Sequence, residues 1–328
     1  MVSKNTLQIY VPFALPSKKR SLVVLYTDRR QALHNCFIGP LITFLGRHFT
    51  LYPVSVHRLL RGKEKLPKHH GGIFSVLQAR TWSQLLPALE RYLDGAPVVF
   101  YDQDPWEAYH DNAAAPGAYK LVHDALNVKR FLVTSSFWAD YIRQEDALPA
   151  EFVRMSILPE YCDVGKEFAR RQYPVAFQGS LHPHRKAFFE RMKGLGVTLQ
   201  TLPPVPYKQF LTAIQSIGIF LHDESNAIEM NGQKCNLNGI WVKEIEVAAR
   251  GCFAIRNSDL DMDAYGISEL PVIRPFTDEA EVPGIIDDIL SLPEEQRNSM
   301  RREAVETIRR RNDWMTVVDA LRRCFPSL

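Results

Sequence analysis

Groups that could accept a proton gather in one short stretch of the chain, residues 101–111 (YDQDPWEAYHD). The candidates for a general base are Asp102, Asp104, Glu107 and His110, because carboxylates and imidazoles most often take the proton of a reacting hydroxyl. The same letters also fit a plain helix entry, with an aspartate cap followed by a proline in the first turn. Both interpretations can hold at once.

A second stretch, residues 177–186 (FQGSLHPHRK), has the composition of a phosphate-binding turn. A predicted strand ends at Gly179, Ser180 lies in the turn, and Arg185 follows near the start of a predicted helix. Glycine lets a phosphate approach the backbone, a helix N-terminus is electropositive, and arginine can bind phosphate through two nitrogens. An ordinary strand-to-helix turn is the alternative. The two histidines of HPH have no further ligands, so we expect no metal site here.

A third stretch, residues 241–255 (WVKEIEVAARGCFAI), predicts a helix followed by a strand. Lys243 and Glu246 lie near the helix start, where a carboxylate can accept the two hydroxyls of a ribose and a lysine can offset phosphate charge. The alternative is that Glu246 only complements the helix dipole. Just upstream, the polar residues 222–239, which include Asn238, predict a long loop that lines the same pocket.

These stretches need elements to position them, and the chain supplies an alternation of strand and helix. Short apolar runs such as 21–26 and 97–101 predict strands buried on both faces. Helical patterns separate them, among them residues 81–93, where we expect Pro87 in the first turn. The same alternation recurs after residue 173. It predicts an α/β fold with two Rossmann-like, doubly wound domains, and residues 101–111 then follow a strand at the sheet edge where ligands bind.

The expected boundary lies within residues 155–167 (MSILPEYCDVGKE), which combine a proline, mixed charge and no clear period. We therefore expect a first domain over residues 1–163 and a second over 164–310. Residues 293–324 predict one long or broken charged helix, whose last part, residues 311–328, forms a separate C-terminal unit.

Composition excludes several classes of protein. The 328 residues are 46% hydrophobic and 23% charged, as in ordinary globular proteins, and no apolar run reaches the ~18 residues of a membrane span. The five cysteines are scattered without a CxxC pair, which argues against a disulfide framework and a structural zinc site. The N-terminus does not resemble a signal peptide. We expect a cytoplasmic protein.

Charge is distributed unevenly along the chain. Residues 1–72 contain 12 Lys/Arg and 2 Asp/Glu, a net charge of +10, whereas the remainder has a net charge of −7. This asymmetry predicts that the N-terminal part faces an anionic partner: a lipid head-group surface in a membrane-peripheral protein, an acidic glycan or a nucleic acid. A solvated basic surface is the alternative.

The run EVAARGCFAI (residues 246–255) resembles the E-A-x-A-x-G-x-P-V run in the C-terminal domain of GT-B glycosyltransferases. In the CgeB-like group, its upstream companion is a strand ending F-x-G-S followed by an H/Y-P-x-R stretch, which FQGSLHPHR matches. Residues 155–168 resemble the interdomain linker of these enzymes. Residues 278–328 resemble their closing segment, in which a helix with a tryptophan, here Trp314, packs back toward the N-terminal domain. The resemblance covers residues 130–328 and is faint before them.

The resemblance implies two Rossmann-like domains that face each other, with the acceptor on the N-terminal side and the nucleotide sugar on the C-terminal side. It implies sugar transfer from a nucleotide-diphosphate sugar, as co-substrate, to a hydroxyl acceptor without a metal or other cofactor. Glu246 would bind the ribose, and the diphosphate would lie against Gly179, Ser180, Arg185 and Lys243. Retaining members often have a glutamate eight residues before the ribose-binding one. Asn238 stands there instead, so the stereochemistry stays open.

Two further interpretations remain. The chain could be a non-catalytic binding module whose basic N-terminal half grips an anionic polymer or a membrane surface. It could also be a glycosyltransferase whose acceptor is a glycan, a lipid-linked glycan or a nucleic acid, with residues 58–72 (RLLRGKEKLPKHHGG) as the acceptor-side contact. The sequence does not specify the sugar, the nucleotide base, the acceptor or the oligomeric state.

Overall fold

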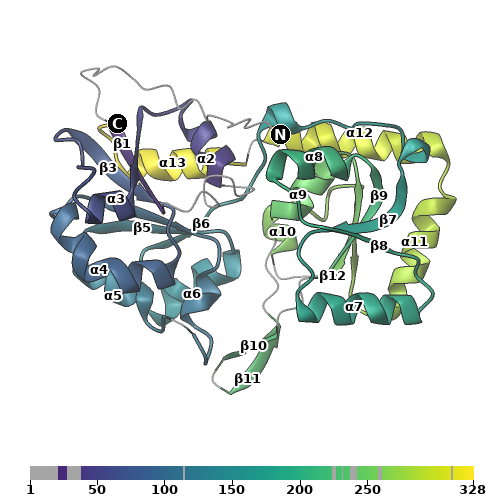
Figure 1. Ribbon diagram of the computed structural model, residues 1–328, viewed down its shortest axis with the longest axis horizontal. Helices are drawn as coiled ribbons and strands as arrows, with labels where there is room; N and C mark the ends of the chain where they lie inside the picture. Colours follow the sequence, from purple (N-terminus) through teal and green to yellow (C-terminus); the bar gives the residue numbers. More distant parts are fainter. Residues whose placement is uncertain are drawn as a thin grey trace, which may run out of the picture.

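Two α/β lobes lie side by side, each with helices against a central parallel sheet (Figure 1). The computed structural model describes residues 21–27, 38–113, 115–223, 227–230, 232–236, 242–257, 261–311 and 313–328. The two parallel sheets confirm the predicted fold class. Across these ranges, no helix is long and apolar enough to cross a membrane.

The first lobe, here called the N domain, has a six-stranded sheet of order β2-β1-β3-β4-β5-β6. Its strands are β1 (Ser21–Tyr26), β2 (Leu51–Ser55), β3 (His70–Ser75), β4 (Val98–Asp102), β5 (Val128–Val133) and β6 (Ala150–Phe152). Its described helices are α2 (Ile38–Leu45), α3 (Val56–Leu60), α4 (Ala79–Leu93), the 3-10 helix η1 (Pro105–Ala108), α5 (Ala118–Ala125) and α6 (Ser136–Glu145).

Helix α4 packs an apolar stripe on the N-domain sheet. Trp82 is buried against Phe100, with ring centroids 3.7 Å apart, and the leucines at 86, 89 and 93 are buried beside it. The expectation that Pro87 lies in the first turn is wrong, because α4 begins at Ala79 and Pro87 lies in its interior. Proline has no N–H to donate to the carbonyl four residues earlier. Burial of the stripe on both sides of Pro87 offsets that loss.

The second lobe, the C domain, has a five-stranded sheet of order β13-β12-β9-β7-β8. Its strands are β7 (Tyr173–Gln178), β8 (Gln200–Leu202), β9 (Ile217–His222), β12 (Phe253–Asn257) and β13 (Ile273–Phe276). Its helices are η3 (Phe168–Arg170), α7 (Pro183–Gly194), α8 (Tyr207–Ile214), α9 (Val242–Ala249), α10 (Met262–Tyr265), η4 (Glu279–Glu281), α11 (Val282–Ser291) and α12 (Glu294–Arg311). The winding direction of this sheet reverses between β7 and β9, which is the place where open α/β sheets bind ligands.

The C-terminal helix belongs to the hydrophobic core of the N domain. The charged segment 293–324 is broken into α12 and α13 (Met315–Cys324), and α13 lies among N-domain elements (Figure 1). Trp314 is fully buried there in one cluster with Leu22 and Phe74. Phe325 lies so close to Gly72 that an added Cβ would be 2.3 Å from its ring. Only glycine therefore fits at that point of β3.

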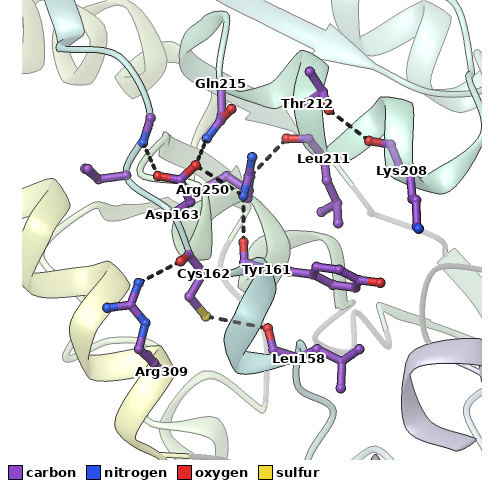
Figure 2. Close-up of polar contacts among 12 residues, drawn as sticks. Leu158, Tyr161, Cys162, Asp163, Lys208, Leu211, Thr212, Gln215, Arg250 and Arg309 are labelled. Atoms are coloured by element: carbon purple, nitrogen blue, oxygen red, sulfur yellow. Dashed lines mark hydrogen bonds and ion pairs between the residues drawn. The ribbon is translucent and has the colours of Figure 1, made fainter. Parts of the chain in front are cut away.

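The linker between the domains is bound to the C domain through its backbone carbonyls. It contains the 3-10 helix η2 (Pro159–Tyr161). Arg250 donates to the carbonyl oxygens of Tyr161, at 2.7 Å, and Leu211, at 3.0 Å, and Arg309 donates to that of Cys162, at 2.7 Å (Figure 2). Arg250 directly follows α9, so its hydrogen bonds hold the linker at the C-terminal end of that helix. The N-terminal part of α9 contains the candidate residues Lys243 and Glu246.

Residues 222–239 are not the plain loop that their polarity predicts. They contain a hairpin of β10 (Ala227–Met230) and β11 (Gln233–Asn236), paired antiparallel. Gly232 lies in the turn between the two strands with a φ of 71°, a backbone conformation that favours glycine. The signal was present in the sequence, because an Asn-Gly pair between two short runs is a strong indication of a hairpin. The prediction of one long loop over residues 222–239 was therefore wrong, while its role in lining the donor pocket stays a prediction.

Candidate functional site

Gly179 lies at the end of β7, beside the reversal in strand order. Its φ is 149°, in the region that favours glycine, and a Cβ there would lie 3.0 Å from the Phe177 ring and 3.1 Å from Lys243 Nζ. A side chain would therefore displace the lysine or the ring. The glycine keeps the backbone accessible at the switch point, as expected for a residue that a phosphate approaches.

Basic side chains surround the ring of Phe177. The Arg185 guanidinium lies 4.8 Å and the Lys243 ammonium 5.4 Å from the ring centroid, and the His222 ring stacks on it at 6.0 Å. Arg185 is buried and donates to the Ser180 carbonyl oxygen at 2.7 Å. Lys243 makes no ion pair with any residue that the structure describes. An aromatic face attracts cations without neutralising them, so the ring does not neutralise Lys243.

Glu246 is a fully buried carboxylate in α9, with a side-chain exposure of 0%. By strict hydrogen-bond geometry neither of its oxygens has a partner among the described residues, although the Tyr207 hydroxyl is close enough to act on its pKa as a hydrogen-bond donor. Burial raises the pKa of Glu246 to about 8, Tyr207 and Lys243 act to lower it, and Glu244 adds to the rise. Buried polar groups are nearly always hydrogen-bonded. The open capacity of Glu246 therefore points to hydroxyl groups of a ligand.

Three more charged side chains are buried beside these residues and were missed as site residues. Glu244 Oε1 lies 2.7 Å from His222 Nδ1 and 3.3 Å from Arg256 Nη1, and all three side chains are at most 2% exposed. His222 and Arg256 are register partners on adjacent strands. The available signal was position: each lies at a strand end or a helix start at the sheet edge that binds ligands.

The candidate bases of the N domain lie at the end of β4. Asp102 is buried and accepts hydrogen bonds from the Tyr119 hydroxyl, at 3.0 Å, and from the Asp104 backbone N–H, at 2.9 Å. Gln78 donates to the Asp104 carboxylate at 2.7 Å. The predicted helix entry is present as η1, with Pro105 at its first position, although Asp104 does not cap it through its side chain. Glu107 and His110 are half-buried.

The carboxyl edges of the two sheets face each other. The Tyr265 hydroxyl of α10 donates to the Thr134 carbonyl at 2.7 Å, and Asp261 accepts from the Ser136 backbone N–H at 2.8 Å, at the start of α6. Asp102 lies on the adjacent strand, where it pairs with Val133 of β5 and its backbone carbonyl accepts from the Thr134 N–H at 3.3 Å. These contacts place the carboxyl end of the N-domain sheet against the segment that follows β12 in the C domain.

Other predicted features lie elsewhere. Asn238, residues 1–20 and residues 28–37 are outside the described residues. The loop 61–69 leads into the amino end of β3, the sheet edge opposite Asp102, and exposes Arg61, Lys63, Lys65 and Lys68. The rings of His182 and His184 stack at 5.9 Å. No group of three or more potential metal ligands occurs in the part of the chain that the structure describes.

No protein-family model and no curated protein matches the sequence. Solved structures do match. An alpha-glucosyltransferase in complex with UDP and a 13-mer DNA is 11% identical, with a TM-score of 0.59 over 94% of this chain and 100% of that chain. HepE from Anabaena, in complex with UDP and glucose, is 10% identical, with a TM-score of 0.59 over 94% and 99%.

The BGT protein of phage T4, in complex with its UDP-glucose substrate, is 10% identical, with a TM-score of 0.55 over 93% of this chain and 99% of that chain. Identities this low show the fold alone. The chain has the GT-B fold. The predicted pair of facing Rossmann-like domains is therefore confirmed.

Proposed function

We propose that this chain is a glycosyltransferase that moves a sugar from a nucleotide-diphosphate sugar to a hydroxyl group of an acceptor. The observation that carries the proposal is Glu246, a fully buried carboxylate with open hydrogen-bonding capacity close to basic side chains. A ribose offers paired hydroxyls and a diphosphate offers negative charge, so one nucleoside diphosphate satisfies both halves of this site. The UDP or UDP-glucose named with the matching structures supports the same ligand class.

In the proposed step, the bond between the anomeric carbon and the diphosphate oxygen breaks, and the nucleoside diphosphate leaves with the electron pair. A bond forms between the anomeric carbon and the acceptor oxygen, whose proton passes to a base. Arg185, Lys243 and the start of α7 stabilise the charge that develops on the diphosphate. These groups supply that stabilisation without a metal ion, so we propose a metal-independent reaction.

The base in our proposal comes from residues 104–110. Asp104, Glu107 and His110 are half-buried and can be reached from the interdomain region. Asp102 accepts hydrogen bonds from Tyr119 and from the Asp104 backbone. We therefore propose that it positions Asp104 and does not act as the base itself. Trp106 can stack on a sugar ring, whereas Tyr109 already stacks on Trp138 and donates to Asp146. Because Asn238 occupies the position of the second glutamate of many retaining enzymes, we leave the stereochemistry of transfer to product analysis.

For the acceptor we propose a glycan, a lipid-linked glycan or DNA. One matching structure contains DNA with the enzyme, and the exposed cations of loop 61–69 favour an anionic partner. Those cations lie at the sheet edge opposite Asp102. They would therefore bind a part of the acceptor distant from the reacting hydroxyl, or a membrane surface. A non-catalytic polyanion-binding module is the second candidate. The CgeB-like motifs support membership of the CgeB-like group of glycosyltransferases. The described cysteines are free thiols, which supports a cytoplasmic location.

The experiment combines binding and turnover. Thermal unfolding is followed with UDP, GDP, ADP and dTDP, and a panel of nucleotide sugars is screened for slow hydrolysis without an acceptor. The same assays are run with Glu246→Ala and with Glu303→Gln, an exposed control in α12. We expect one nucleotide to raise the melting temperature, since a ligand that binds only the folded state stabilises it, and Glu246→Ala to lose the effect. If no nucleotide changes the melting temperature and no donor is hydrolysed, the binding-module candidate replaces this one.

A further inference from the structure

The hairpin β10–β11 is a C-domain element whose tip rests on the N domain. It leaves the C domain between β9, which ends in His222, and α9, which contains Glu246. In Figure 1 it projects below the C-domain sheet toward the N domain. The hairpin therefore connects the candidate donor site to the opposite lobe.

Two hydrogen bonds and one apolar side chain fix the tip. The Asp111 backbone N–H donates to the Glu229 carbonyl oxygen at 2.7 Å, and the Gly232 N–H donates to the Asp111 carboxylate at 2.8 Å. Met230 is 8% exposed and belongs to the N-domain hydrophobic cluster against which Trp106 and Tyr109 pack. The same N-domain segment that carries the candidate bases thus receives the hairpin.

The chain crosses between the domains on the other side of the molecule. The linker and the start of α13 run together there, with Arg154 Nη1 3.3 Å from the Asp313 carboxylate and the Arg154 N–H donating to the Thr316 hydroxyl at 3.2 Å. Figure 1 shows both crossings at the upper side and the hairpin at the lower side. A rotation of one lobe about these two crossings would therefore move the hairpin tip away from Asp111, while the contacts near the crossings would lengthen less.

We propose that the β10–β11 hairpin is a clasp that holds the two domains closed, with Asp111 as the positioning residue that fastens it. The hairpin undocks when substrates enter and products leave, and docks to keep water away from the bound donor. This last role rests on the proposed function, whereas the docking itself does not. Loops that close over a bound substrate serve this purpose in many enzymes.

The docking is tested without any assay of activity. Hydrogen–deuterium exchange of the full chain is followed for a peptide containing residues 109–113, whose Asp111 amide is protected only while the hairpin is docked. Met230→Ala removes the apolar anchor, and Asp111→Ala removes the carboxylate acceptor. We expect exchange at Asp111 to be at least about tenfold faster in Met230→Ala than in the wild type. Asp124→Asn, an exposed control in the same domain, should leave it unchanged.

The closing role is tested with the nucleotide sugar that the hydrolysis panel identifies. Met230→Ala and Asp111→Ala should raise the ratio of donor hydrolysis to transfer several-fold, and circular dichroism should show both variants folded. Equal exchange in the wild type and Met230→Ala would overturn the clasp. Faster exchange with an unchanged hydrolysis ratio would overturn its role in excluding water. A wild type that consumes no donor would count against the proposed function, while the exchange data still decide the docking.

Discussion

Charged residues at the carboxyl edges of the two sheets differ in whether their hydrogen bonds are satisfied within the protein. On the C-domain edge, Glu246 is buried with open hydrogen-bonding capacity, and the cations near it face an aromatic ring. On the N-domain edge, the carboxylates serve local structure. Asp102 accepts from Tyr119, Asp104 accepts from Gln78, and Tyr109 donates to Asp146 at 2.6 Å.

The C-domain edge therefore has the features of a ligand-binding site, whereas the carboxylates at the N-domain edge hold the local structure in place. Burying a carboxyl group with unfilled hydrogen-bonding capacity costs free energy, and in our proposal the ribose hydroxyls of the nucleotide fill that capacity at Glu246. Asp102 and Asp104 of the N domain already have hydrogen-bond partners, so their arrangement does not indicate which acceptor binds. The donor class can therefore be inferred from the structure, whereas the acceptor must be found by experiment. Four substitutions test this contrast.

The largest expected effect is on the buried C-domain charges. Glu244→Gln leaves Arg256 and His222 without their shared carboxylate. Removing one partner of a buried ion pair costs about 3–5 kcal/mol, and we expect a loss of that order in urea unfolding. Glu303→Gln, exposed in α12, is the matched control. A loss no larger than that of the control would mean that the buried charges are not coupled.

The second effect is a pH dependence of stability from Glu246. Its folded pKa of about 8 lies above the value of 4.5 for an unperturbed glutamate, so the folded state binds the proton more tightly and stability falls as pH rises from about 4.5 to about 8. Glu246→Gln removes this term. Its stability relative to the wild type should increase by a few kcal/mol, as an order of magnitude, between pH 5 and pH 9. Parallel curves for the two proteins would contradict the raised pKa.

The third effect is on turnover. Lys243→Ala removes one of the cations proposed to stabilise the leaving diphosphate, and loss of a single such group typically costs about 100-fold or more in rate. Donor hydrolysis and transfer should both fall by about that factor. The control is Lys208→Ala on the exposed side of α8, which should behave as the wild type. Equal rates for the two variants would remove Lys243 from the site.

The smallest effect tests whether Asp102 has a structural role or belongs to the nucleotide-binding site. Asp102→Asn should weaken the contacts to Tyr119 and the Asp104 backbone and lower stability by about 1–3 kcal/mol. We expect it to leave nucleotide affinity within about twofold, because the donor site lies in the other domain. A large loss of nucleotide affinity with little loss of stability would reverse the assignment and place Asp102 in the site.

The sequence predicted best what is encoded locally. The strand at 21–26 is exact, and the strand ending at Gly179 and the helix containing Glu246 are within one or two residues, because apolar runs and nearby glycines define such elements. The residues that we propose for the donor site, Gly179, Arg185, Lys243 and Glu246, lie inside two such local units. Their positions could therefore be inferred before the fold was known.

What the sequence did not predict depends on distant contacts. His222 and Arg256 meet at Glu244 only because β9 and β12 are adjacent in the sheet. The hairpin was missed although the Asn-Gly pair indicated it, and its contact with Asp111 joins segments about 120 residues apart in the sequence. Pro87 stays inside α4 because packing on the sheet outweighs a local preference. Charge counting found the basic N-terminal half but not that loop 61–69 leads to the opposite sheet edge.

The most direct test of the central claim is calorimetric binding of the nucleoside diphosphate that stabilises the protein, compared with its 2′,3′-dideoxy counterpart. If Glu246 binds the ribose hydroxyls, the dideoxy compound should bind the wild type at least about tenfold more weakly. In Glu246→Gln, that difference should shrink. Equal affinity of the wild type for both compounds would contradict the account, because the buried carboxylate would then have another purpose.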